Sequence, residues 1–497
     1  MCTLFLITLT AMKTRILLFT GILILFIKIN ASAQYSSEVN EKIQRVEKNL
    51  IPNIQTENDG PTTMEDRMAF YKVHGVSVAV IHNYKLEWAK GYGYADDSLK
   101  TPVTPQTLFQ AASISKSLNS VGVLKLVQEK KIDLYADINT YLTSWKFPYD
   151  SLSKNKKISI ANLLSHTGGL TVHGFGGYEK GKEIPTIEQI LEGKKPANSP
   201  AIHSMYEPGI KSEYSGGGIT ISQLIVMDVT HQAYDKFMYN NVLKPLGMTG
   251  STYTQPPAGI KSELLATAYR YNGKALPGKY HIYPEQAAAG LWTNPTDLSK
   301  YIIETQLALE GKSHKVINQQ NTKLRLTPYL NKYAALGVFI DSLQDGVKYF
   351  EHGGANEGFR CQYFGSMEGG NGVVVMVNSD NEAIMNEIVN SVAKVYDFKG
   401  LNRSKFRKEI ALADTILQKY TGKYEISSKL SFAVTLEGSK LYGQPTGQQK
   451  QQLFPESQNK FFLKKIDVEV EFVKDDKGKI VKAILYENGT HDAKKIE

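Results

Sequence analysis

The tetrapeptide Ser113-Ile114-Ser115-Lys116 opens a run whose apolar residues have helical spacing. These residues are Leu118, Val121, Leu124 and Val127, and they predict a helix over residues 113–128. On a helix, Ser113 and Lys116 are neighbours on one face. A helix N-terminus favours the negative charge of a serine alkoxide, and a lysine amine one turn further on can take the serine proton. The tetrapeptide is therefore a candidate nucleophile and base, although the same pattern is common on solvated helix surfaces.

Two further segments carry residue types that suit such a site. Tyr214 stands before three glycines and after Pro208-Gly209, which predicts a tyrosine in a tight turn. The stretch Glu351-His352-Gly353-Gly354-Ala355 follows residues 347–350, which predict the end of a strand. Glycines such as Gly354 would let an extended substrate approach the strand edge. Taken alone, the first segment is better interpreted as a core tyrosine beside a flexible loop, and the second also fits a simple strand-end turn.

The order of these segments resembles the serine β-lactamase and penicillin-binding protein superfamily, whose first motif is Ser-x-x-Lys. The resemblance is to its class C-like branch, which uses Tyr-x-Asn as second motif and Lys-Thr-Gly or His-x-Gly as third. Here the motifs are Ser113–Lys116, Tyr214–Gly216 and His352–Gly354. The resemblance covers about residues 38–396. It includes four supporting stretches, which are Gly75–Val80, Leu163–Leu170, Pro245–Met248 and Ala287–Leu291.

The resemblance implies a two-step mechanism. Ser113 would attack a carbonyl and form an acyl-enzyme, while Lys116 and Tyr214 move protons. We expect nearby cations to lower the pKa of Tyr214, so that its phenolate activates water in deacylation. The backbone N–H groups of Ser113 and Ala355 would form the oxyanion hole. His352 takes the place of the third-motif lysine and would orient Tyr214 or bind a substrate carboxylate.

The chain departs from the family pattern at two positions. Gly216 replaces the asparagine whose amide contacts the acylamino side chain of substrates in the family. His352, in place of lysine, weakens the expectation of a fixed positive charge for a β-lactam carboxylate. Both changes argue against an efficient β-lactamase and leave peptidase and esterase activities open.

The first 33 residues are typical of a secretory signal peptide. Lys13 and Arg15 precede an apolar stretch over residues 16–27, and Ala31-Ser32-Ala33 forms a cleavage site. We therefore expect a secreted or periplasmic protein, with an uncleaved membrane anchor as the alternative. Removal of this segment, which also contains Lys28 and Cys2, would reduce the formal net charge from +9 to +9 − 3 = +6.

Composition argues against several other classes of function. Hydrophobic residues make up 42% and charged residues 22% of the chain, as in globular proteins. The basic residues are scattered, and we expect pairs such as Lys464 and Lys465 to be solvated surface with no role in nucleic-acid binding. Cys361 alternates with aromatic residues in a predicted strand and is expected to be a buried small hydrophobe. With no clustered ligands, neither a metal site nor a cofactor is expected, and His166 and His203 are interpreted as structural.

Periodicity places the motifs in an α/β architecture. The resemblance implies the two-lobed β-lactamase/transpeptidase-like fold: an antiparallel sheet flanked by helices, with an all-α insertion that begins near residues 133–142. The predicted domain covers residues 38–396, and its site would lie between the lobes. The segments predicted from periodicity are helices over 41–50, 219–229 and 382–396, and strands over 76–81, 86–94, 359–364 and 373–377.

The residue pattern of the sequence changes after Asp397. Residues 398–408 are basic and typical of a linker. Short alternating runs follow at 430–436 and 468–473, separated by turn signals such as Asn488-Gly489. This pattern resembles the small lipocalin-like β domain often appended to the family, and predicts an all-β domain over 410–497.

Together these features predict a secreted serine hydrolase with an acyl-Ser113 intermediate. The expected substrates are D-amino-acid peptides or cell-wall fragments, and association with the cell envelope is possible on this basis. Two alternatives are an esterase of small acyl esters and a non-hydrolysing, penicillin-binding-type receptor. The intact serine, lysine and tyrosine argue against the receptor. The sequence leaves the oligomeric state open.

Overall fold

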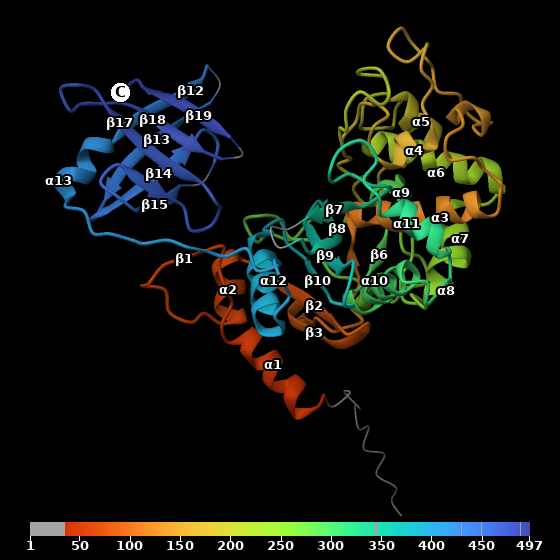
Figure 1. Cartoon of the computed structure of the whole chain (residues 1–497), viewed down its shortest axis with the longest axis horizontal. Coiled ribbons are helices and arrows are strands. Elements are labelled where there is room, and N and C mark those ends of the chain that lie inside the picture. Colours follow the sequence, from red (N-terminus) through yellow and green to blue (C-terminus); the bar gives the residue numbers. More distant parts are fainter. Residues whose placement is uncertain (1–34, 343–345, 429, 449, 488) are drawn as a thin grey trace, which may run out of the picture.

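The computed structural model describes residues 35–342, 346–428, 430–448, 450–487 and 489–497. The predicted signal peptide lies outside these residues. Within them, none of the helices combines the length and the apolar character that a membrane crossing would need. The chain forms a larger body of sheet and helices and a smaller C-terminal barrel, joined by an extended linker (Figure 1).

A seven-stranded antiparallel sheet forms the base of the larger body. Its strand order is β4-β3-β2-β10-β9-β8-β7. The strands are β2 (Gly75–His82), β3 (Lys85–Asp96), β4 (Thr101–Pro102), β7 (Phe339–Ser342), β8 (Lys348–Asn356), β9 (Phe359–Ser366) and β10 (Gly372–Val377). Since strands from both ends of the domain meet at the centre of this sheet, the long segment between β4 and β7 is an insertion.

The central strands β2 and β10 are buried along almost their whole length because helices cover both faces of the sheet. On β2, Val76, Val78 and Val80 belong to one hydrophobic core, whereas Ala79 and Ile81 belong to the other. The first core also contains residues of α1 (Ser37–Glu47), α2 (Met64–Tyr71) and α12 (Ala383–Tyr396). The helix α10 (Pro295–Leu309) packs against β2, β3, β9 and β10 from the second side.

The insertion is mostly helical and carries the candidate site. Its helices are α3 (Ser115–Gln128), α4 (Ile160–Leu164), α5 (Ile187–Glu192), α6 (Gly216–Thr230), α7 (Tyr234–Met238), α8 (Lys244–Leu246), α9 (Gln286–Ala289) and α11 (Gln319–Arg325). The predicted fold class, an α/β sheet domain with an all-α lobe, is confirmed.

Three local predictions were wrong. The helix predicted from Ser113 begins as a 3-10 turn, η1 (Ala112–Ile114), and becomes α-helical at Ser115. The glycines after Tyr214 form the first turn of α6, which the Ser215 side chain caps by accepting from the N–H of Gly218 at 2.9 Å. Residues 352–355 lie inside β8, not at a strand end. At Tyr214 and at residues 352–355, tertiary packing overrides the turns that glycines suggest locally.

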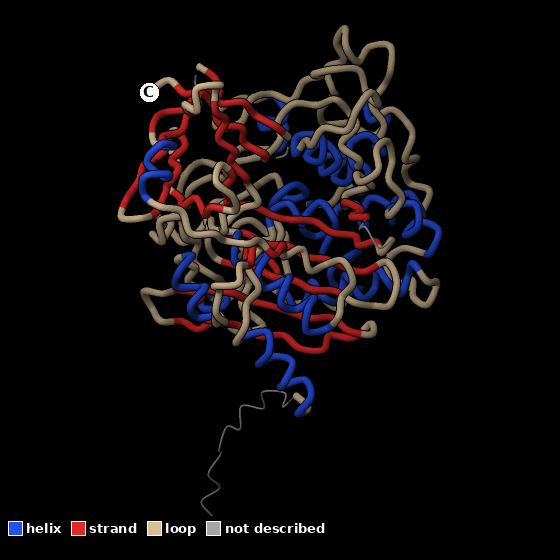
Figure 2. Tube along the Cα trace, turned by 60° about the vertical axis from the view of Figure 1, so that its left-hand side comes forward, coloured by secondary structure: helices blue, strands red, loops and turns tan. Residues whose placement is uncertain are grey.

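The C-terminal residues form a closed barrel of eight antiparallel strands and one short helix, α13 (Asp414–Leu417) (Figure 2). β12 pairs with β19 and closes it, so the barrel has no free sheet edge. Five aromatic residues fill its interior: Tyr420, Tyr424, Phe432, Phe461 and Phe472. The strands are β12 (Gly422–Ser427), β13 (Leu430–Glu437), β14 (Lys440–Pro445), β15 (Gln451–Pro455), β16 (Lys460–Phe462), β17 (Glu469–Lys474), β18 (Ile480–Tyr486) and β19 (Thr490–Lys495).

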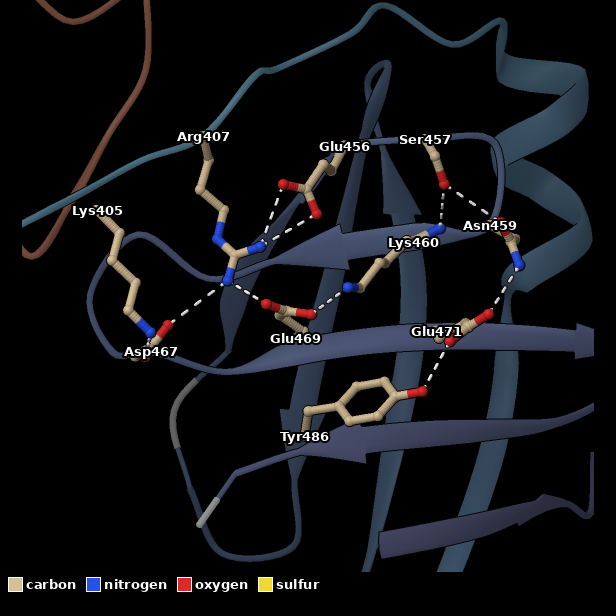
Figure 3. A network of polar contacts seen from close by, with 10 residues as sticks. All are labelled: Lys405, Arg407, Glu456, Ser457, Asn459, Lys460, Asp467, Glu469, Glu471 and Tyr486. Atoms are coloured by element: carbon tan, nitrogen blue, oxygen red, sulfur yellow. Dashed lines mark hydrogen bonds and ion pairs between the residues drawn. The ribbon is translucent and has the colours of Figure 1, made fainter. Parts of the chain in front are cut away.

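The linker is fastened to both bodies. Its strand β11 (Lys405–Phe406) pairs in parallel with β1 (Ile54–Gln55) of the larger body. Figure 3 shows Arg407 between Glu456, which it binds through two hydrogen bonds of 3.1 Å, and Glu469 on the barrel. A linker held at both sides fixes how the barrel stands against the larger body.

The basic pair Lys464 and Lys465 was predicted to be solvated surface, and this prediction was wrong. Both side chains are half-buried. Lys464 donates to Asp59 and to the Thr56 hydroxyl, both at 2.9 Å, across the boundary between the bodies. The folding of the barrel onto the loop after α1 brings these residues together, which no local pattern reveals.

Candidate active site

Ser113 and Lys116 are in direct contact at the start of α3. The Lys116 side chain is 1% exposed, and its Nζ donates to Ser113 Oγ at 2.9 Å. The same amine donates to the carbonyl oxygen of Ala288, on α9, at 2.6 Å. Ser113 keeps part of its surface exposed. The hydroxyl is therefore reachable from solvent while the amine behind it is shielded.

Burial changes the charge of this amine. Desolvation lowers the pKa of Lys116 from its ordinary value of 10.5 to about 7. Within the described residues, no carboxylate forms an ion pair with Lys116 that would hold its charge. A large fraction of the amine is then neutral near pH 7, which is what a general base for Ser113 requires.

Tyr214 completes the group, but its predicted ionisation was wrong. The Lys116 amine lies 4.9 Å from the centre of the Tyr214 ring. Burial raises the pKa of the Tyr214 phenol, and a hydrogen bond with Ser113 offsets only part of that effect. The expected cations do not lower this pKa because Lys116 is itself desolvated and His352 is neutral. Tyr214 is therefore a proton donor near pH 7, and Lys116 is the base.

His166 holds Tyr214 in place. The centres of their rings lie 4.3 Å apart, and the Nδ1 atom of His166 accepts from the backbone N–H of Ser215 at 3.2 Å. Burial keeps the pKa of His166 well below its usual range, so the ring is neutral. His203 is exposed, in a loop. Over the described residues no group of three His, Cys, Asp or Glu side chains is placed to hold a metal.

His352 is also neutral. Its side chain is 3% exposed, and burial, with the charge of Lys116 as a second cause, lowers its pKa to about 3. A neutral His352 cannot form an ion pair with a substrate carboxylate. The other expected role, orienting Tyr214, stays a prediction, with the two ring centres 6.2 Å apart. Its Nδ1 lies 2.6 Å from the Gly353 carbonyl oxygen, which assigns the proton to Nδ1. The buried Nε2 has no hydrogen-bond partner among the described residues.

The edge of β8 at the site is free, and Gly354 explains how it comes close to the nucleophile. β7 pairs with residues 348–351 only, so β8 has no strand on that side over residues 352–356 in the described structure. β8 packs against η1, and a Cβ atom on Gly354 would lie 2.3 Å from the carbonyl oxygen of Ala111. The backbone that lies close to Gly354 is therefore the chain's own, at Ala111, where the sequence pattern predicts the backbone of a substrate. The oxyanion role of Ala355 stays a prediction.

Gly216, at the position of the second-motif asparagine, is tightly packed. A Cβ atom on Gly216 would lie 3.1 Å from both the His173 carbonyl oxygen and the Phe175 ring. The imidazole Nδ1 of His173 is 2.5 Å from the Tyr214 carbonyl oxygen, which ties this loop to the tyrosine. The loop therefore packs closely against position 216.

Sequence reasoning missed an aromatic wall beside Tyr214. Phe339 of β7 stacks at 6.3 Å from the Tyr214 ring and lies 5.2 Å from the His352 ring. Tyr333, 52% exposed, continues the wall at 6.1 Å from Phe339. The dense aromatic spacing of the segment Tyr329–Phe339 was the available signal, but it matches no motif.

Comparisons with known proteins agree with this geometry. A family model described as Beta-lactamase matches residues 62–393, and a second, described as a domain of unknown function (DUF3471), matches residues 407–497. "Protein flp" of Staphylococcus aureus (strain N315) is 27% identical over 321 residues, which is 63% of this chain and only 61% of that relative's length. "Penicillin-binding protein 4*" of Bacillus subtilis (strain 168) is 23% identical over 423 residues, covering 81% of this chain and 90% of the relative.

Solved structures share the fold. A penicillin-binding protein homologue from Pyrococcus abyssi superposes with a TM-score of 0.60 at 21% identity, covering 87% of this chain and 98% of that one. A D-amino acid amidase from Ochrobactrum anthropi SV3 gives a TM-score of 0.56 at 20% identity, covering 73% and 99%.

Proposed function

The chain belongs to the beta-lactamase family of serine hydrolases, and from that membership we propose that it hydrolyses acyl substrates through an acyl-Ser113 intermediate. One observation carries the proposal: a buried amine with a pKa of about 7 donates a 2.9 Å hydrogen bond to the candidate nucleophile. A lysine with its ordinary pKa would be protonated at neutral pH and could not act as a base.

The geometry supports one distribution of protons. Neutral Lys116 takes the Ser113 proton as the serine oxygen bonds to the substrate carbonyl carbon. The Tyr214 phenol gives its proton to the leaving nitrogen or oxygen, and the Lys116 ammonium restores that proton. In the second step the same amine takes a proton from water, whose oxygen attacks the acyl carbon. The bond between that carbon and Ser113 Oγ then breaks, and the Lys116 ammonium returns the proton to Ser113 Oγ.

We propose D-amino-acid peptides or cell-wall-derived fragments as substrates. Support comes from the shared fold of the D-amino acid amidase and from the penicillin-binding relatives. Phe339, which is partly exposed beside Tyr214, offers an apolar surface to a substrate side chain. The alternative, an esterase of small acyl esters, is favoured by Gly216, which offers no amide to an acylamino group.

Mapping of the adduct tests the proposal. Protein lacking residues 1–33 is mixed with a fluorescent penicillin and separately with p-nitrophenyl butyrate, and its peptides are analysed by mass spectrometry. A persistent penicilloyl group on Ser113 supports a peptidase or a penicillin-binding-type receptor. Ester turnover without an adduct, lost in Ser113→Ala, supports the esterase. Absence of any reaction at Ser113 contradicts the hydrolase proposal.

The pKa of Lys116 predicts the pH dependence. Activity needs the neutral amine, so kcat/KM is expected to rise with pH and level off above an apparent pKa of about 7. At one pH unit below that value, about tenfold less activity is expected. No descending limb is expected up to pH 9, because burial raises the pKa of Tyr214. A rate that falls between pH 7 and 9 would contradict a phenol acting as acid.

The aromatic wall predicts a substrate preference. Tyr333→Ala is expected to raise KM about tenfold for substrates with a large apolar side chain next to the scissile carbonyl. Acetyl substrates should be unaffected, because they do not reach Tyr333. Tyr271→Ala is the matched control, since Tyr271 is 48% exposed and takes part in none of the contacts of the site. Equal effects on both substrate sizes would contradict the prediction.

We also propose export from the cytoplasm, on the sequence pattern of residues 13–33. Expression of the full chain followed by sequencing of the mature N-terminus tests it. Cleavage after Ala33 supports a secreted or periplasmic protein, and a retained N-terminus in the membrane fraction supports the anchor.

A further inference from the structure

A cleft of about 740 Å³ separates the barrel from the larger body and shares no lining residue with the candidate active site. One wall is the segment after α1, around Asn58 and Asp59, together with Phe70 of α2. The other wall comes from β15 and from Lys464 and Lys465 on the barrel. The volume lies within the range of about 300–1,000 Å³ that is usual for ligand sites, and domain boundaries are a preferred location for them.

The walls of this cleft are held apart at a fixed distance. Lys464 bridges them through Asp59 and Thr56. Arg407 and the pairing of β1 with β11 fix the linker beside them (Figure 3). A site whose walls are fastened in this way is preformed, so a ligand would not have to bring the two bodies together.

The lining is rich in amides and has one exposed ring. Five amide side chains contribute to it: Asn49, Gln55, Asn58, Gln451 and Gln452. The Oε1 atom of Gln451 is buried and has no hydrogen-bond partner in the part of the chain that the structure describes. The Phe70 ring is 52% exposed. A buried acceptor without a donor is costly unless water or a ligand supplies one.

One cation of the cleft is left without an anion. Arg67, Lys464 and Lys450 pair with Glu387, Asp59 and Glu437 respectively. The remaining cation, Lys465, lies over the Phe70 ring at 4.8 Å and has no acidic partner among the described residues. Burial and the charge of Arg67 lower the pKa of Lys465. A ligand with a negative group would relieve this repulsion.

We propose that the cleft binds a saccharide that carries a carboxylate. Amide side chains offer a donor and an acceptor together, which matches neighbouring sugar hydroxyls. Lys465 and Arg67 both lie over the Phe70 ring, so we expect a pyranose to contact the part of this ring that stays exposed, while Lys465 pairs with the carboxylate. This binding is independent of the acyl-Ser113 chemistry, so either proposal can fail while the other stands.

Calorimetry on protein lacking residues 1–33 tests the inference. The probe is the disaccharide N-acetylglucosaminyl-N-acetylmuramic acid, and its uncharged counterpart is N,N′-diacetylchitobiose, which lacks the lactyl carboxylate. We expect the acidic disaccharide to bind wild-type and Ser113→Ala protein equally, and at least about tenfold more tightly than diacetylchitobiose. Lys465→Gln should remove that advantage. Lys477→Gln, on an exposed barrel turn, is the matched control and should retain it.

The melting temperature of each variant shows whether it is folded, and ester turnover shows whether Ser113 is intact. Equal affinity for the two disaccharides, or affinity that Lys465→Gln leaves unchanged, would overturn the proposal. It would also be overturned if a free D-alanyl-D-alanine peptide bound in a Lys465-dependent way and the disaccharide did not, since the occupant would then be a peptide. Weaker disaccharide binding by folded Phe70→Ala protein would add support.

Discussion

Replacing Lys116 with methionine is expected to lower kcat by about 10²–10⁴-fold, the range that general bases contribute. Methionine fills a similar volume but cannot accept the Ser113 proton. KM should change little, because Lys116 is 1% exposed and lies behind the nucleophile. Steady-state kinetics on the better of the two substrate classes gives the comparison.

The same variant has a predicted effect on stability. In the folded protein the pKa of Lys116 is about 7, whereas in the unfolded chain it is near 10.5. Between these values the unfolded state binds more protons, so the stability of the wild type rises with pH over that window. Lys116→Met should therefore be more stable than wild type at pH 7, by a margin that shrinks towards pH 10.

Lys125→Met is the matched control on the same helix. Lys125 is partly exposed and pairs with Glu129 at 3.0 Å. Its replacement should leave kcat and the pH dependence of stability unchanged. If Lys116→Met kept wild-type kcat, Tyr214 would have to be the base, and the neutral amine would have no part in the chemistry.

Sequence reasoning reached the contact between Ser113 and Lys116 because a three-residue spacing on a helix is a local property. It reached the sheet for a similar reason: apolar runs such as residues 76–81 and 373–377 are typical of strands with both faces covered. The C-terminal all-β domain could also be predicted, because short alternating runs separated by turn signals are typical of antiparallel strands.

The ionisation of Tyr214 was beyond the sequence because it depends on how much of the phenol is desolvated, a property of the folded lobe. The wall formed by Phe339 depends on β7 standing next to β8, a pairing between segments without motifs. The cleft around Lys465 requires the barrel to dock on residues 49–62. Burial and long-range docking therefore determine the parts of the site that residue patterns cannot predict.

Gly354→Ala is expected to lower kcat by about 10²–10³-fold, comparable to the loss of an oxyanion-hole donor. A Cβ atom at this position would lie 2.3 Å from the Ala111 carbonyl oxygen and 2.5 Å from the Sγ atom of Cys361. Real Cβ atoms do not approach so closely, so β8 must move away from η1. The free edge of β8 would then lose its position relative to Ser113, and the melting temperature should also fall.

Two comparisons separate the causes. Gly60→Ala adds the same methyl group where no atom lies within 4 Å and should leave activity unchanged. Adding Cys361→Ala to Gly354→Ala removes the sulfur overlap but leaves the overlap with the Ala111 carbonyl oxygen. If the double variant recovers kcat, the sulfur was responsible and β8 need not be seated against Ala111. If kcat stays low while the melting temperature recovers, the close packing of β8 against η1, the turn that contains Ser113, is required for activity. Glycine at 354 is then required by the chain's own backbone, whether or not a substrate also pairs with the edge of β8.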